Sequence, residues 1–160
     1  ALEELMLYAW TQGGDLNVSR TIIDFDISEI PADARIDSAL LSLFYNPSSA
    51  YATQHSGETS FTIQRLITAW EESTVTWSTQ PTATYSNIVF INGASTPYQD
   101  FPRMDITALI QDYTNDPFNS HGLVLKFIEE SPYKNLILSS SDYPIDSYRP
   151  ILEVYYTVLE

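Results

Sequence analysis

The sequence predicts an all-β fold, an antiparallel β-sandwich with one short helix. Two observations carry this prediction. Apolar and polar residues alternate with a period of two in several short segments, which is the pattern of half-buried strands. Turn residues such as Pro31, Gly57, Pro81 and Pro132 separate these segments at short intervals. Many short strands punctuated by turns in this way are typical of an antiparallel sandwich.

Each strand is predicted from its own alternation. In the first, Ile23, Phe25 and Ile27 alternate with the polar residues Asp24 and Asp26. A period of two places successive side chains on opposite faces of a strand. Related apolar and β-rich runs predict strands over residues 22–27, 40–45, 61–67, 122–127, 136–138 and 152–157.

One segment, residues 105–114, departs from this pattern and predicts a short helix. Its apolar residues recur at helical spacing: Ile106, Leu109, Ile110 and Tyr113. Asp105 is expected to cap its start, and the sequence Asn-Asp-Pro at 115–117 to end it. The stretch 67–72 is ambiguous and is compatible with a single helical turn.

Composition and charge restrict the function. Seven Lys and Arg against 21 Asp and Glu give a net charge of −14 over 160 residues. Nucleic acids and anionic lipid surfaces attract clustered basic residues, so neither is an expected partner. No stretch approaches the ~18 apolar residues of a membrane helix, so membrane insertion is not expected. The chain has no cysteine, which excludes disulfides, thiolate metal sites and cysteine nucleophiles.

A single β-sandwich module is expected over residues 1–158, because no linker, repeat or low-complexity tract interrupts the chain. The last two residues, 159–160, are interpreted as a cloning remnant. The first four residues lack the basic and apolar regions of a signal peptide. An acidic chain without cysteine that is rich in Tyr and Thr fits a domain of a secreted bacterial protein, although a cytosolic protein can have the same composition. We expect a module cut from a larger secreted protein, with neighbouring domains and an extracellular or cell-surface location.

Several segments resemble the motifs of one family. Residues 20–32 read like its opening "R-x-L-L-x-F-D-L-S-x-I-P-A", and residues 70–81 like its most specific motif, "W-x-E-x-T-V-T-W-x-x-Q-P". Shorter likenesses occur at 39–43, 105–107, 122–126 and 149–152. On these residues the chain resembles the DNRLRE domain family, which is related to carbohydrate-binding module family 96 and to the archaeal disaggregatase repeats.

This resemblance implies a sandwich of jelly-roll type in large secreted or surface proteins, where such modules are thought to bind polysaccharides, alginate among them. Members usually open with a further strand. Here only residues 5–8 and the pair Gly13-Gly14 precede the first motif, so either that strand is missing or another segment replaces it. Alginate is a polyanion, and a net charge of −14 repels it within a Debye length, ~8 Å at physiological salt. A neutral polysaccharide therefore ranks at least equal to alginate.

The tryptophans have two interpretations. Trp70 and Trp77 lie seven residues apart in the most specific motif. An exposed tryptophan offers a face on which a sugar stacks, whereas a buried one contributes a large apolar area. Their place in a fixed motif favours the core, so both are predicted to be buried. The same holds, less strongly, for Trp10.

Eleven tyrosines are many for a chain of this length, so some are expected at the surface. Those in or beside predicted loops are Tyr98, Tyr113, Tyr133, Tyr143 and Tyr148. A tyrosine supplies a rigid ring and a hydroxyl at a small entropic cost, which suits a sugar-binding surface. The alternative is that the hydroxyls bond neighbouring backbone at the corners of the sandwich. The candidate ligand-binding residues are Tyr98, Tyr133, Tyr143 and Tyr148.

Oxygen ligands gather in two predicted loops. The candidates for a structural Ca²⁺ ion are Asp112, Asn115, Asp116 and Asn119 in one loop, and Asp142 and Asp146 in the other. Calcium takes six to eight oxygens from carboxylates, amides and carbonyls. The same side chains also cap helices and close turns without a metal, and this alternative stays open.

Catalysis has little support in the sequence. The two histidines, His55 and His121, are isolated, and the adjacent acid pairs 71–72 and 129–130 would point to opposite faces of a strand. The chain is therefore predicted to be a non-catalytic extracellular carbohydrate-binding module that binds a polysaccharide, to whose hydroxyls Asp24 and Asp26 could add hydrogen bonds. The alternative is a structural or adhesive module of a bacterial cell-surface protein with no glycan ligand.

Overall fold

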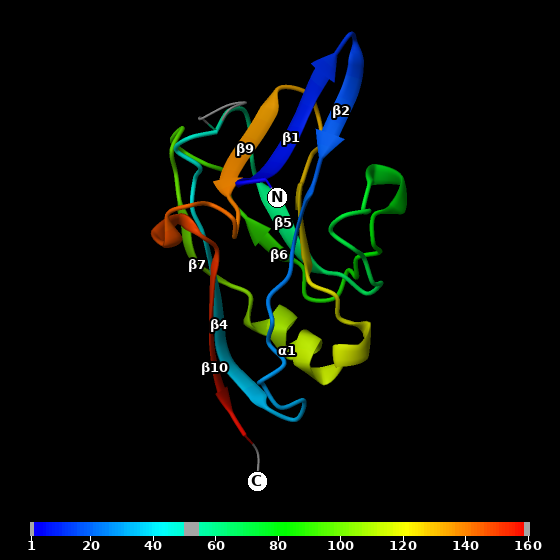
Figure 1. Ribbon diagram of the computed structural model, residues 1–160, viewed down its shortest axis with the longest axis vertical. Helices are drawn as coiled ribbons and strands as arrows, with labels where there is room; N and C mark the ends of the chain where they lie inside the picture. Colours follow the sequence, from blue (N-terminus) through cyan, green and yellow to red (C-terminus); the bar gives the residue numbers. More distant parts are fainter. Residues whose placement is uncertain (1, 50–54, 159–160) are drawn as a thin grey trace.

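The computed structural model describes residues 2–49 and 55–158. Within these residues, ten strands form three antiparallel sheets, and one α-helix packs against them (Figure 1). This confirms the predicted all-β sandwich with a single short helix. The interpretation of residues 159–160 as a cloning remnant lies outside the described residues.

The first sheet has the strand order β2-β1-β9. Its strands are β1 (Glu4–Gln12), β2 (Asp15–Ser19) and β9 (Lys134–Ser139). A two-residue turn joins β1 to β2, with Gly13 at φ 64° and Gly14 at φ 99°. Positive φ at both central residues is what a tight hairpin turn of type I′ requires, and glycine adopts it without steric cost. This hairpin was not predicted from the sequence. It projects from one end of the molecule (Figure 1).

The second sheet has the order β10-β4-β7. Its strands are β4 (Arg35–Leu43), β7 (Phe101–Asp105) and β10 (Ile151–Thr157). The chain that leaves β4 continues alongside β9, where Tyr45 forms an isolated bridge with Leu138. The Asn46 N–H donates to the Ile137 carbonyl at 3.1 Å. Strand β9 therefore connects the first sheet to the second.

The third sheet has the order β3-β8-β5-β6. Its strands are β3 (Thr21–Ile23), β5 (Phe61–Arg65), β6 (Val89–Ile91) and β8 (Leu123–Phe127). The strand predicted over 22–27 ends at Ile23 instead. Beyond it, the Asp24 carboxylate accepts the Phe25 N–H at 3.0 Å and the Asp26 carboxylate accepts the Ser28 N–H at 3.1 Å. These local bonds replace a strand ladder.

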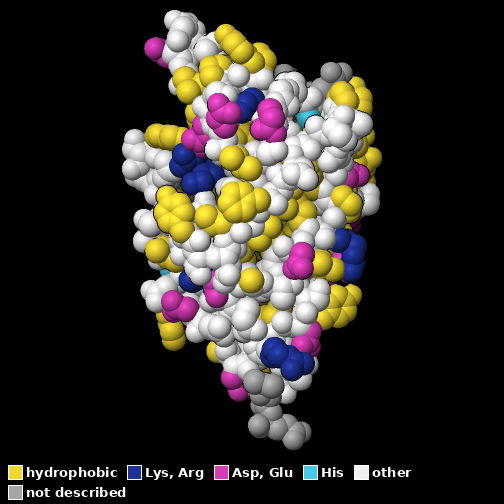
Figure 2. Space-filling view, turned by 180° about the vertical axis from the view of Figure 1, so that it is seen from behind, with side chains coloured by type: hydrophobic (Ala, Val, Ile, Leu, Met, Phe, Trp, Pro, Cys, Tyr) yellow, Lys and Arg dark blue, Asp and Glu magenta, His cyan; other side chains and the backbone are white. Residues whose placement is uncertain are grey.

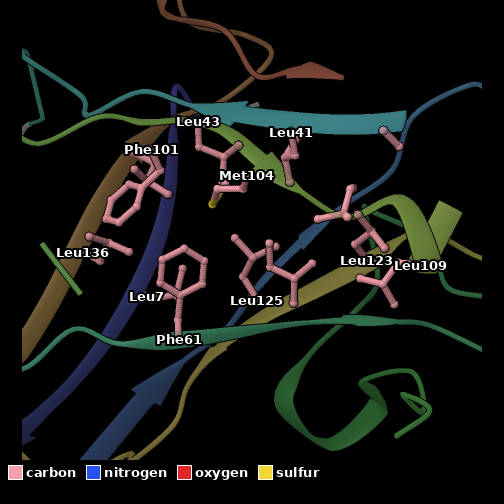
Figure 3. Packing of buried hydrophobic residues seen from close by; sticks show 14 of the residues in the cluster. Leu7, Leu41, Leu43, Phe61, Phe101, Met104, Leu109, Leu123, Leu125 and Leu136 are labelled. Atoms are coloured by element: carbon pink, nitrogen blue, oxygen red, sulfur yellow. The ribbon is translucent and has the colours of Figure 1, made fainter. Parts of the chain in front are cut away.

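The hydrophobic core lies between the third sheet and the other two. Figure 3 shows Leu41 and Leu43 of β4 pointing toward Phe61 of β5 and Leu125 of β8, with no solvent exposure at any of the four. Burying a side chain of this size stabilises the fold by about 1.5–3 kcal/mol. The Phe61 ring also meets Phe101 edge to face, with centroids 5.3 Å apart.

Helix α1 (Thr107–Asn115) closes one end of this core with Leu109 and Ile110. It begins two residues later than predicted. The Asp105 carboxylate accepts the Thr107 N–H at 3.0 Å, so Asp105 still supports the first turn. Residues 67–72 form no helical turn; the short helical elements elsewhere are η1 (Trp77–Thr79), η2 (Pro117–Asn119) and η3 (Asp146–Tyr148). Among the described residues, no helix has the length and apolar character needed to cross a membrane.

Candidate functional site

Three of the four tyrosines predicted to bind ligand lie together in the fold. Tyr98, Tyr143 and Tyr148 surround Tyr45, which follows β4. The ring centroids are 5.6 Å apart for Tyr45 and Tyr98, 6.0 Å for Tyr45 and Tyr148, and 5.7 Å for Tyr143 and Tyr148. We call these four residues the tyrosine cluster. Tyr45 was not among the sequence candidates, because it lies at the end of a predicted strand rather than in a loop.

The four rings differ in their access to solvent. Tyr98 is 50% exposed, and Tyr45 and Tyr148 are half-buried. Tyr143 is only 3% exposed, and its hydroxyl shares a hydrogen bond of 2.9 Å with the Ser48 hydroxyl. Tyr143 is therefore the buried ring that supports the cluster, whereas the other three rings are accessible to a ligand.

The backbone of Tyr45 is held by two neighbouring segments, one that carries Asp100 and one that carries Ser139. Its backbone N–H donates to the Asp100 carboxylate at 3.1 Å, and the Ser139 hydroxyl donates to its carbonyl at 3.2 Å. Partial burial and the neighbouring Tyr148 hydroxyl raise the pKa of Tyr45.

His55 fixes the loop that carries Tyr98. Its backbone N–H donates to the Pro97 carbonyl at 2.8 Å, and its Nε2 lies 3.0 Å from the Gln99 carbonyl. Its Nδ1 accepts the Ile137 N–H of β9 at 3.3 Å, so the proton of the neutral ring is on Nε2, which donates to Gln99. Burial lowers the pKa of His55, and this keeps the ring neutral. The residues on both sides of Tyr98 are thus anchored to β9.

Tyr133 lies apart from the tyrosine cluster, next to Trp10. The two rings meet edge to face, with centroids 5.3 Å apart and planes 83° apart. Tyr133 is 59% exposed and Trp10 is 45% exposed, so the predicted burial of Trp10 is wrong. Trp10 points away from the core because it alternates with the buried residue Ala9 along β1.

The two motif tryptophans are not core residues either. Trp77 is 52% exposed, and the predicted burial is wrong for it. Trp70 is half-buried, and its indole N–H donates to the His121 carbonyl at 2.7 Å. The motif therefore fastens a surface loop to the sandwich instead of filling the interior.

A second set of bonds completes this attachment. The Arg20 guanidinium lies 4.6 Å from the Trp77 ring centroid and donates to Gln80 Oε1 at 2.7 Å. It also forms two bonds with the Glu130 carboxylate, at 2.6 and 2.8 Å. We call Arg20, Trp77, Gln80 and Glu130 the arginine clasp. A pocket of about 220 Å³ lies beside it, floored by the apolar side chains of β3, β8 and the loop.

The predicted calcium ligands do not converge. The six candidates are Asp112, Asn115, Asp116, Asn119, Asp142 and Asp146. The Asp112 carboxylate accepts bonds from Ser86 at 3.1 Å and Asn87 at 2.8 Å, whereas both oxygens of Asp116 accept from Asn119, at 2.9 and 3.2 Å. In the described ranges no group of three or more His, Cys, Asp or Glu is placed to hold a metal. As arranged, these side chains do not fit a calcium ion, and calcium binding stays a prediction from the sequence.

A groove of about 660 Å³ lies between residues 24–32 and the end of α1. Asp24, Asp26 and Tyr113 line it, and the Tyr113 hydroxyl donates to the Asp24 carboxylate at 3.1 Å. Burial, with a smaller contribution from Asp24, raises the pKa of Tyr113 to about 12. Asp26 also closes a local turn with Ser28, and Asp24 also accepts the Phe25 N–H, so the first role of both is structural.

The fold and its surface define a class of protein, a small β-sandwich module with exposed aromatic rings. The family model of carbohydrate-binding module family 96 matches residues 6–143, and the chain belongs to this family. The search of curated proteins finds no match to this sequence. The matched region begins within β1 and includes the arginine clasp, Tyr45 and Tyr98, whereas Tyr148 and β10 follow it.

Proposed function

We propose that this protein is a non-catalytic module that binds a polysaccharide through the tyrosine cluster. The observation that carries the proposal is the convergence of Tyr45, Tyr98 and Tyr148 into one accessible aromatic surface. The C–H faces of a sugar stack on aromatic rings, and its hydroxyls bond the tyrosine hydroxyls. The chain's membership of a carbohydrate-binding family supports this interpretation over a general protein-binding surface.

The charge distribution favours a neutral polysaccharide. The net charge is −14, and the exposed carboxylates of Asp100 and Asp146 lie beside the cluster. The basic side chain that follows Tyr148, Arg149, is paired with Asp146 at 2.8 Å and donates to the Tyr143 carbonyl at 2.7 Å. A polyanion such as alginate would meet repulsion here, and the guanidinium of Arg149 is already engaged by the protein.

Most basic side chains elsewhere in the protein are also engaged rather than free to bind a polyanion. Six of the seven basic side chains are engaged by acceptors of the protein itself. They are Arg20, Arg35, Arg103, Lys134 and Arg149 in ion pairs and Arg65 with Asn119 and Ser120. On the face in Figure 2, the basic side chains form isolated groups rather than a continuous patch.

The imidazole of His55 has a structural task, which supports a non-catalytic role. His55 is 7% exposed and both of its ring nitrogens are used by backbone groups. His121 holds Trp70 through its backbone carbonyl.

We propose an extracellular setting within a larger protein. A single aromatic surface gives only millimolar to micromolar affinity, and a tethered enzyme or a second module multiplies such weak binding.

Affinity electrophoresis tests the proposal. The protein is run through gels that contain a neutral polysaccharide (xylan, a mixed-linkage glucan or a galactomannan) or alginate. We expect retardation by a neutral polysaccharide and less or none by alginate. Tyr98→Ala should lose about tenfold or more in affinity, which corresponds to one stacked ring of about 1.4 kcal/mol. Tyr85→Ala is the matched control, because Tyr85 is also exposed but lies outside the cluster.

The outcomes separate the alternatives. Equal retardation of Tyr98→Ala and the wild type would contradict the placement of the site. A broad panel with no binder would support the structural or adhesive module. Release of reducing ends or unsaturated products by repurified protein would show that it is an enzyme.

A further inference from the structure

We infer that Trp10 and Tyr133 form a second glycan-binding platform, separate from the tyrosine cluster, so that the module carries two sites for a neutral polysaccharide. We call these two residues the Trp10 platform. The inference rests on the proposed function, because it assumes that the ligand is a sugar polymer. It adds a site, a valence and a set of residues that the proposed function does not include.

The platform is a cross-strand pair. Ala9 and Lys134 are register partners between β1 and β9, so the next residues outward, Trp10 and Tyr133, face each other where β9 begins. Ala9 is fully buried, and alternation therefore places Trp10 on the outer side of the sheet. The ring planes are 83° apart. One ring thus offers its face while the other forms a wall beside it.

The backbone of Tyr133 is unusual for an exposed residue. Its φ is 72°, in the left-handed region that bulky side chains rarely adopt. Two contacts hold it there. The Tyr133 N–H donates to the Ala9 carbonyl at 2.8 Å, and Gly57 packs so closely that a Cβ on it would lie 2.5 Å from the Tyr133 carbonyl oxygen.

In this conformation the Tyr133 ring lies beside Trp10. Strained backbone of this kind gathers at functional sites. The strained backbone is an observation independent of exposure, and it falls on one of the two platform residues, Tyr133.

The polar groups at the platform suit sugar hydroxyls. The Thr11 hydroxyl lies 3.5 Å from the Tyr133 hydroxyl, and Asn17 of β2 is the register partner of Trp10. The neighbouring cation, Lys134, is 6% exposed, and its ammonium donates to the Glu129 carbonyl at 2.8 Å. The ammonium of Lys134 is therefore not presented to a uronate, and the platform suits a neutral sugar.

The two sites lie at opposite ends of β9. Tyr133 immediately precedes the strand, whereas the Tyr45 bridge to Leu138 is near its far end. Six strand residues span about 20 Å, so the sites are too far apart to contact the same monosaccharide. They can contact separate segments of a polymer. Figure 1 shows the hairpin of β1 and β2, which carries Trp10, projecting beyond the rest of the molecule, where a polymer can reach it.

Affinity electrophoresis on the neutral polysaccharide that retards the wild type most tests the inference. Four proteins are compared with the wild type: Trp10→Ala, Tyr98→Ala, the double variant and the control Trp77→Phe. We expect each single alanine variant to be retarded less than the wild type, with an affinity about tenfold or more lower, because two sites on one polymer act together. The double variant should not be retarded. Melting curves confirm that each variant is folded.

Tryptophan emission gives a second measurement. The tyrosine cluster has no tryptophan, so stacking on Trp10 is reported by emission while binding at the cluster is not reported by direct stacking. We expect a short oligosaccharide of the same sugar to change the emission of the wild type and of Trp77→Phe, but not of Trp10→Phe.

The outcomes distinguish this inference from the proposed function. If Trp10→Ala were retarded as strongly as the wild type, and the sugar did not change the emission of the wild type, the platform would be overturned and the tyrosine cluster would remain. Loss of retardation in Trp10→Ala alone, with Tyr98→Ala unchanged, would support the platform and overturn the cluster. Failure of the wild type to bind any polysaccharide would overturn both.

Discussion

The Arg20 guanidinium carbon lies 4.6 Å from the centroid of the Trp77 ring. The same guanidinium bonds Glu130, and this bond raises the pKa of Arg20, so the group stays charged. Arg20 stands at the junction of β2 and β3, Trp77 in the loop over the third sheet, and Glu130 between β8 and β9. One side chain therefore ties three parts of the chain together.

The first prediction concerns this clasp. Arg20→Ala should lower the free energy of unfolding by about 1–3 kcal/mol, since it removes a half-buried bidentate pair and a cation–π contact together. Trp77→Ala should cost less, about 1–2 kcal/mol, because half of the ring is already in water. Urea unfolding measures both.

A double-mutant cycle checks the contact itself. The Arg20→Ala/Trp77→Ala protein should show a coupling energy of about 0.5–1 kcal/mol, the value of an exposed cation–π pair. Additive effects would mean that the two groups do not interact. A cost of about 3–5 kcal/mol for Trp77→Ala would indicate a buried ring and contradict its position in the structure.

The second prediction separates support from ligand contact in the tyrosine cluster. Tyr143→Phe removes the bond to Ser48 and should cost about 1 kcal/mol, and Tyr143→Ala should cost about 3–5 kcal/mol because it opens a cavity. Tyr98→Ala should stay within about 0.5 kcal/mol of the wild type, since the residue is exposed. Thermal or urea unfolding gives all three values. A destabilised Tyr98→Ala would assign Tyr98 a structural role.

Part of the sandwich could be predicted from local alternation, because Ile36 at the start of β4 is buried between two exposed neighbours. Strand β8 was predicted from its apolar, β-rich run, since four of its five residues are buried. Strand β1 was missed as an element because its outer face also carries large side chains, Met6, Tyr8 and Trp10, so apolar residues do not alternate with polar ones. The helix was found, but its first residue depends on the bond between Asp105 and Thr107, which spacing alone does not fix.

The candidate site was less accessible from the sequence. The loop context of Tyr98 and Tyr148 was a sufficient signal for exposure, but their convergence on Tyr45 depends on the pairing of the chain after β4 with β9. The motif tryptophans were assigned to the core because a fixed pattern does not distinguish a core residue from a surface attachment. Arg20 and Gln80, which reveal the difference, are 60 positions apart.

The third prediction concerns calcium. An ion at residues 112–119 would have to draw Asp112 away from Ser86 and Asn87 and separate Asp116 from Asn119. We therefore expect metal-stripped protein to melt at the same temperature in saturating Ca²⁺ and in EDTA. A bound ion at a hundredfold excess over its Kd would add about 2.7 kcal/mol to the free energy of unfolding. A rise of that size, abolished by Asp116→Asn, would establish a calcium site here; abolition by Asp142→Asn would place it in the other loop.

The fourth prediction concerns pH and follows from His55. Burial lowers the pKa of His55 below its usual value of 6.5, while the Gln99 carbonyl and Asp100 act in the opposite direction and are outweighed. The unfolded chain therefore binds the proton more tightly than the folded protein does. Stability from neutral His55 is complete above pH 6.5 and is lost as the pH falls from 6.5 through the lowered pKa of the folded state.

The loss of this stability should affect the position of Tyr98 first. Nδ1 of His55 now accepts the Ile137 N–H, and a proton on Nδ1 would point a second N–H at this donor. The bond to β9 would then be lost. This would release β9 from the loop that His55 holds at Pro97 and Gln99. We expect the melting temperature and the retardation by polysaccharide to fall together as the pH is lowered from about 8 to 5. His55→Gln should remove the part of this dependence that begins near 6.5, whereas His121→Gln, the matched control, should keep it. Retardation that stays constant while the melting temperature falls would show that His55 stabilises the fold without positioning Tyr98.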